Sequence, residues 1–298
     1  MKKLVKSALA CGLLCSAALM TAPAFAETDD KLPDLYEISD GDSSIFVYGT
    51  IHVLRDGTVW EKPELKNRID NADRVLFELD VDAPDFNMQA AQAMQSKMPN
   101  TSGNKLSESL TTEELAELTE LIAGIGMPAQ MIDQFDPWVF YLQLANVDLV
   151  KMGLNPAVGV EATLQKHVAA AGKDIEGLET LDQQLNIFET TPWDEQVAAL
   201  KSYLANRDQG AELINKMIAM WQQDQIDEIA TLLNENLESS PALAQKLIGD
   251  RNANWVATFK DLLANDEKAF IAVGAGHLPG AEGVLTMMES AGYSITRH

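Results

Sequence analysis

Two of the four histidines in this chain end the same short pattern. The apolar run at residues 44–48 leads into Gly49-Thr50-Ile51-His52, and the run at 269–273 leads into Gly274-Ala275-Gly276-His277. One Gly-x-x-His alone is more typical of a structural histidine, but two in the same setting favour function. Ligands of open α/β sheets bind beyond the carboxyl ends of the strands, and glycine lets the backbone approach a ligand closely. We therefore expect neighbouring strands to bring His52 and His277 together, with Gly49 and Gly274 beside a ligand.

A glutamate adds a third group to this pair. Glu78 lies within another apolar run, residues 74–79, where an unpaired carboxylate would be costly to bury. Its partner could be a metal ion, a shared proton, or an arginine such as Arg74 or Arg251. Two histidines and one glutamate leave a coordination position open for water, which suits a catalytic metal. The sequence thus predicts a divalent metal site of His52, Glu78 and His277, with manganese, cobalt or zinc as the ion.

The elements that would position these residues indicate an α/β fold. The strands lie near both ends of the chain, so we expect a mixed sheet with a long helical insertion at about 105–265. Thr111 and Glu114 have the spacing of a capping box that starts one of the inserted helices. Strands are predicted at 35–38, 44–48, 74–79, 174–178, 269–273 and 293–296, and helices at 63–71, 138–152, 161–171 and 281–291.

The first 26 residues read as a secretory signal peptide. A lysine-rich start is followed by a short apolar run and by Ala24-Phe25-Ala26, which predicts cleavage after Ala26. Both cysteines, Cys11 and Cys15, lie in this segment. The mature domain, residues 27–298, would then have no thiol, which excludes a disulfide scaffold, a cysteine nucleophile and cysteine-ligated zinc. We expect a periplasmic or secreted protein whose single domain has no further membrane segment.

The charge argues against some classes of partner. The chain has 22 basic and 45 acidic side chains and a net charge of −23. Binding to nucleic acid relies on clustered lysine and arginine that contact phosphates, so nucleic acid is not expected as a partner. The oligomeric state cannot be predicted from these patterns.

Several segments together resemble the TraB/PrgY/GumN family, and most of all its exported GumN-like branch. They are YGTIHV, VLFELD, GVEATL, IEGLETLDQQL, DRNANW and VGAGHLPG, in this order over nearly all of the mature chain. The family is grouped with the TIKI metalloproteases, which have two Gly-x-x-His motifs and a glutamate, and more distantly with erythromycin-esterase-like and haem-binding α/β proteins. The resemblance implies an active site at His52, Glu78 and His277. It adds Glu161, Glu179 and Arg251 as candidates for supporting or substrate-binding roles.

The leading hypothesis is an exported metal-dependent hydrolase that acts on a peptide or protein, with Arg251 stabilising an oxyanion or holding a substrate carboxylate. One alternative is a metal-free, esterase-like hydrolase in which His52 is the general base and Glu78 orients it. Another is a regulatory envelope protein that binds a peptide or haem in the same crevice and cleaves nothing.

Overall fold

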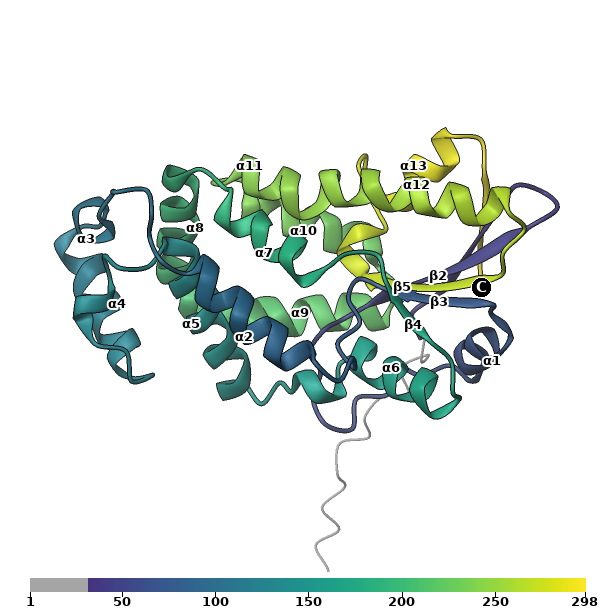
Figure 1. Ribbon diagram of the computed structural model, residues 1–298, viewed down its shortest axis with the longest axis horizontal. Helices are drawn as coiled ribbons and strands as arrows, with labels where there is room; N and C mark the ends of the chain where they lie inside the picture. The colour runs from purple at the N-terminus through teal and green to yellow at the C-terminus, as the bar shows by residue number, and fades with distance from the viewer. Residues whose placement is uncertain (1–31) are drawn as a thin grey trace, which may run out of the picture. The chain divides into compact units, whose positions relative to one another are not determined.

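The two strands predicted at 35–38 and 44–48 form a hairpin. The computed structural model describes residues 32–298 (Figure 1), so the predicted signal peptide lies outside the described residues. Strand β1 (Leu35–Ser39) pairs antiparallel with β2 (Ser44–Thr50). In the turn between them, the Asp40 carboxylate accepts a hydrogen bond of 3.0 Å from the backbone N–H of Ser43. A local hydrogen bond between a side chain and the backbone favours a tight connection of this kind.

The hairpin is one side of a six-stranded mixed sheet in the order β4-β3-β5-β2-β1-β6. Strand β5 (Ala269–Gly274) lies between β2 and β3 (Arg74–Phe77) and is parallel to both. At one edge, β4 (Ile175–Gly177) pairs parallel with β3, and at the other, β6 (Ser294–Arg297) pairs antiparallel with β1. The parallel strands β2, β3 and β5 therefore end at the same edge of the sheet.

Both faces of the sheet are covered, which explains why β5 is apolar throughout. Phe270 and Ala272 of β5 pack into a core on one face, whereas Ile271 and Val273 pack into a second core on the other. Figure 1 shows α1 (Pro63–Asn71) and α6 (Val160–Ala170) on the first face. On the second face lie α12 (Asp250–Ala264) and α13 (Val284–Ser290). A strand buried on both faces reads as a continuous apolar run.

The helical segment between β3 and β5 is interrupted by α6, which packs on the sheet, and by β4, which pairs with β3. Thr111 and Glu114 form the predicted capping box at the start of α4 (Thr112–Ala123), with both reciprocal hydrogen bonds present. A third core, which includes Leu118, Phe140 and Leu200, holds α4, α5 (Pro137–Lys151) and α8 (Trp193–Asn206) together. The remaining α-helices here are α2 (Phe86–Lys97), α3 (Leu106–Ser109), α7 (Leu181–Glu189), α9 (Gly210–Gln222), α10 (Ile226–Leu237) and α11 (Pro241–Ala244).

The prediction of a strand over residues 74–79 was wrong at its end, because β3 stops at Phe77. The carbonyl of Glu78 still accepts from the N–H of Glu179 at 3.1 Å, and after it a buried side chain is the hydrogen-bond partner. Gln165 donates to the carbonyl of Leu79 at 2.6 Å and accepts from the N–H of Val81 at 3.0 Å. Glu78 therefore lies just past the strand, where the backbone leaves the sheet.

Among residues 32–298, no helix combines the length and the apolar composition that crossing a membrane requires.

A buried carboxylate at the start of α5 gives a stability prediction. Asp136 is 8% exposed, and burial raises its pKa to about 6, from 3.8. Above pH 6 the folded protein thus holds a desolvated charge that the unfolded chain keeps in water, and this penalty disappears as pH falls below about 4. We expect Asp136→Asn to raise the free energy of unfolding by about 1–2 kcal/mol at pH 7. Asparagine also serves well as an N-cap residue.

Urea denaturation of wild type and Asp136→Asn at pH 7 and pH 3.5 measures this difference. The exposed Asp194, in the first turn of α8, provides a control in Asp194→Asn, which should have little effect at either pH. An Asp136→Asn protein no more stable than wild type at pH 7 contradicts the prediction.

Candidate functional site

The two Gly-x-x-His turns lie next to each other at the edge where β2 and β5 end. Gly49 pairs with Val273 and Thr50 with Gly274 in the parallel register, so both chains leave the sheet at the same level. Helix α9 holds the first turn, because the buried indole of Trp221 donates to the carbonyl of Gly49 at 2.8 Å. The expected juxtaposition of these turns follows directly from the neighbouring positions of the two strands.

The three residues predicted for the site converge on Gly274. A Cβ atom at this glycine would lie 3.1 Å from Glu78 Oε1, 3.4 Å from His52 Nε2 and 3.5 Å from His277 Cδ2. The φ of Gly274 is −51°, which any residue can adopt, so the backbone does not require glycine here. The absence of a side chain leaves open the space between the two imidazoles and the carboxylate.

Glu78 is paired with an arginine, as one of the alternatives predicted. Its carboxylate is nearly buried, accepts from the N–H of Gly274 at 2.7 Å, and pairs with the guanidinium of Arg251. Arg251 also contacts Glu179, at 2.8 Å, whereas Arg74 pairs with Glu176 and Glu267. Burial alone would raise the pKa of Glu78, but the charges around it outweigh burial and lower the pKa to about 2. His277 is neutral, as described below, so the positive charge of Arg251 is the main cause of the lowered pKa of Glu78.

His277 is buried and uncharged. Its Nδ1 lies 2.7 Å from Asn252 Oδ1, and its Nε2 lies 2.9 Å from Arg251 Nη1. Burial lowers the pKa of His277 to about 3. The ring also packs against Trp255, at 4.5 Å between ring centroids. The ring is therefore neutral and held on several sides.

His52 has the opposite character. Its side chain is 64% exposed, and its Nδ1 lies 2.6 Å from Glu161 Oε1. The carboxylate of Glu161 raises the pKa of His52 well above the ordinary value for histidine, so the imidazole carries a proton at neutral pH in this arrangement. The hydroxyl of Thr50 donates to the same carboxylate oxygen. Glu161, rather than Glu78, is thus the carboxylate that orients His52.

Glu161 reaches the first turn because α6 begins against it. The N–H of Val160 donates to the carbonyl of Ile51 at 3.0 Å. A Cβ at Gly159 would lie 2.1 Å from the carbonyl oxygen of His52, so only glycine allows this approach. In the sequence, only the family resemblance singled out Glu161. Asn252, Trp221 and Thr50 were not predicted.

The donors in this cluster suit a divalent metal ion. His52, Glu78 and Glu161 each offer a ligand atom, and these atoms lie within 4.8 Å of one another. Glu161 Oε2 is buried and, within the described part of the chain, has no hydrogen-bond partner; such an atom calls for a cation or a water. One imidazole nitrogen with two carboxylate oxygens is a donor set for zinc, manganese or cobalt. The predicted set had His277 in place of Glu161, but here His277 Nε2 faces Arg251.

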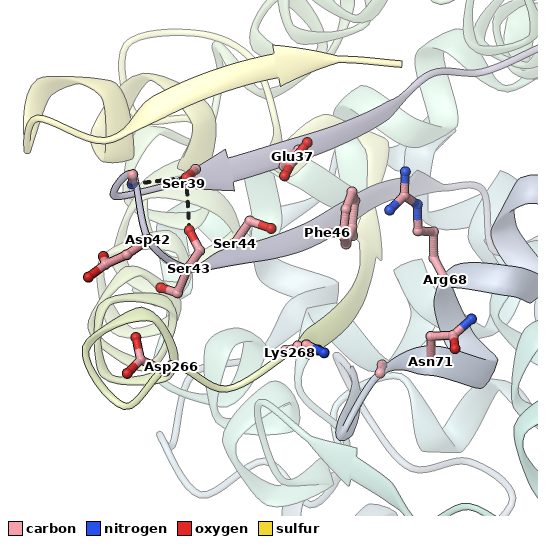
Figure 2. Close-up of a pocket in the computed structure, with 13 residues that line it drawn as sticks. Glu37, Ser39, Asp42, Ser43, Ser44, Phe46, Arg68, Asn71, Asp266 and Lys268 are labelled. Atoms are coloured by element: carbon pink, nitrogen blue, oxygen red, sulfur yellow. Dashed lines mark hydrogen bonds between the residues drawn. The ribbon is translucent and has the colours of Figure 1, made fainter.

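A surface hollow of about 550 Å³ lies elsewhere (Figure 2), at the amino ends of β2 and β5. Phe46, Arg68 and Lys268 are among its lining, and the guanidinium of Arg68 lies 4.0 Å from the centroid of the Phe46 ring. None of the predicted site residues lines this hollow. It is therefore separate from the cluster at Gly274.

Comparison with known proteins gives one family match, and its range contains all the residues of the cluster. The model of the TraB/PrgY/gumN family matches residues 34–297. This range includes both Gly-x-x-His turns, Glu78, Glu161 and the helix that carries Arg251 and Asn252. No curated protein and no solved structure matches the chain. The family expected from the sequence is confirmed.

Proposed function

The chain belongs to the TraB/PrgY/gumN family, and we propose that it is a metal-dependent hydrolase of peptide bonds. One observation carries the proposal, namely the convergence of His52, Glu78 and His277 on the open space at Gly274. The predicted signal peptide and the cysteine-free mature sequence support export, as in the GumN-like branch. The two Gly-x-x-His motifs with a glutamate support a relation to the TIKI metalloproteases.

His52, Glu78 and Glu161 would hold the ion. A divalent ion bound by such donors polarises a substrate carbonyl and lowers the pKa of bound water toward neutrality. Glu78 is kept ionised by Arg251, and the backbone N–H of Gly274 fixes the direction of its carboxylate. Glu161 has a free oxygen for this purpose even while it holds His52 and Thr50.

Arg251 is placed to contact the substrate. Its Nε–H donates to Glu179, and its Nη1 contacts both the carbonyl of Leu247 and His277 Nε2. Its Nη2 pairs with Glu78, which leaves one of the five N–H donors of the guanidinium without a partner among the described residues. That N–H can donate to a developing oxyanion or to a substrate carboxylate.

The test is the metal content of purified residues 27–298. After incubation with manganese, cobalt or zinc and desalting, mass spectrometry should find about one ion per chain, as in a mononuclear site. The ion should be lost in His52→Ala/His277→Ala and in Glu161→Gln. His167→Ala is the control, since His167 lies on α6 like Glu161 but pairs with the exposed Asp70. Wild-type protein that retains none of these ions overturns the proposal.

A second candidate is a hydrolase without metal, and the pairing of His52 with Glu161 favours it. A carboxylate at Nδ1 orients an imidazole so that Nε2 can take a proton from water, and Nε2 here lies beside the open space at Gly274. The raised pKa of His52 counts against this candidate at neutral pH, because a base must be unprotonated. Hydrolysis that survives chelation but not His52→Ala would establish it in place of the first.

A further inference from the structure

Asn252 makes two contacts with the second Gly-x-x-His turn and a third with the loop after it, and nothing of its side chain is exposed. Its Nδ2 donates to two backbone carbonyls, that of Glu282 at 2.6 Å and that of His277 at 3.2 Å. Its Oδ1 lies 2.7 Å from His277 Nδ1. The side chain thus bridges α12, the turn itself and the loop before α13.

These contacts allow only one orientation of the amide. A backbone carbonyl can only accept a hydrogen bond, so the NH₂ group must face the two carbonyls. Turning the amide over would place its oxygen against both of them. The oxygen must therefore face the ring, and as an oxygen it can only accept, so His277 Nδ1 must carry a hydrogen.

The other side of the ring leads to the same result independently. Arg251 Nη1 lies 2.9 Å from His277 Nε2, and a guanidinium has donors but no acceptor. His277 Nε2 must therefore receive this hydrogen bond on its lone pair. Asn252 and Arg251, on opposite sides of the imidazole, both require the neutral Nδ1–H tautomer.

We propose that Asn252 is a positioning residue that holds the proton of His277 on Nδ1 and so keeps an Nε2 lone pair at the site. The two histidines then have unequal roles. His277 is an electron-pair donor and cannot act as a proton donor, whereas His52 is exposed, lies against the Glu161 carboxylate and would itself be a ligand of the ion. This division of roles rests on the proposed function, but the tautomer of His277 does not.

An amide is the group that this position requires. Aspartate would present oxygens to the carbonyls of His277 and Glu282 and would lose both donated hydrogen bonds. Leucine has nearly the same shape but neither donor nor acceptor. It would leave a buried Nδ1–H without a partner, which is costly, so the proton would move partly to Nε2.

The test is the nitrogen spectrum of the imidazoles in metal-free protein labelled with ¹⁵N-histidine. Long-range ¹⁵N–¹H correlations distinguish a protonated from an unprotonated ring nitrogen, and His277→Gln assigns the signals of His277. Wild type should show protonated Nδ1 and unprotonated Nε2. Asn252→Leu should show a substantial Nε2–H fraction. Asn254→Leu, on the exposed face of the same helix, should give the wild-type pattern.

Two results overturn the proposal. Protonated Nε2 in wild type refutes the tautomer, and an unchanged pattern in Asn252→Leu assigns its control to Arg251 alone. If leucine prevents folding, the smaller Asn252→Ala replaces it. In a working hydrolase we expect Asn252→Leu to lower turnover by about 10–100-fold and Asn254→Leu to leave it unchanged. Because the spectrum needs neither metal nor substrate, a protein that hydrolyses nothing would leave the tautomer result standing.

Discussion

Glu78→Gln is expected to abolish the proposed hydrolysis and to lower the free energy of unfolding by about 3 kcal/mol, as for breaking a buried ion pair. Arg251 would keep only Glu179 as a counter-charge in a nearly closed environment. The glutamine amide cannot repair this loss, because its oxygen is needed by the N–H of Gly274. Its NH₂ group would then face the guanidinium, donor against donor.

Urea denaturation at pH 7 measures the stability change, with Glu176→Gln as the matched control. Glu176 lies on β4 and also pairs with an arginine, Arg74, but it is 40% exposed, so its loss should change stability by about 0–1 kcal/mol. The pKa of Glu78 is lowered, so its contribution is complete above about pH 4.5 and is lost as pH falls toward 2. The difference between wild type and Glu78→Gln should therefore narrow in acid. Equal effects of the two variants at pH 7 would contradict the buried pairing.

Gly274→Ala should reduce hydrolysis by about 100-fold, the effect of misplacing reacting groups by a fraction of an ångström to one ångström. The added methyl would enter the space between Glu78 Oε1 and His52 Nε2 and push them apart. The backbone at Gly274 accepts alanine, so we expect a stability loss of only about 1 kcal/mol, at the low end for overpacking.

This variant separates geometry from charge, because every ionisable group of the site remains. The control is Gly210→Ala at the start of α9, where a Cβ would meet only Met152 Cε, at 3.5 Å. Hydrolysis rates and metal affinity should be compared for both variants in protein shown to be folded by circular dichroism. Full activity in Gly274→Ala would show that the reaction does not use this space.

The strands of the sheet could be predicted because each has a clear pattern in its own residues. Residues 269–273 are apolar throughout, and β5 is buried on both faces; the runs at 35–38 and 44–48 likewise predicted β1 and β2. Helix α1 has the predicted bounds, 63–71, because Pro63 starts it. Each of these signals lies within a few residues of the element that it predicts.

Of the candidate site, only the residues that directly follow strands could be predicted from the sequence. The shared Gly-x-x-His pattern predicted that His52 and His277 would meet, and they do so because β2 and β5 are neighbours. The contact between Glu161 and His52 depends on where α6 docks, which no local pattern specifies. The role of Asn252 could not be predicted for a similar reason, since its three partners lie in the turn at His277 and in the loop at Glu282.

The central position of β5 affects how the chain folds while it is being synthesised. Phe46 pairs with Phe270, although more than two hundred residues separate them in the chain. Until residues 269–274 emerge, β2 and β3 have no strand between them, and two apolar edges stay open. Folding with such distant pairings is slow. His277 arrives with the final strands, so no partly synthesised chain holds an assembled site.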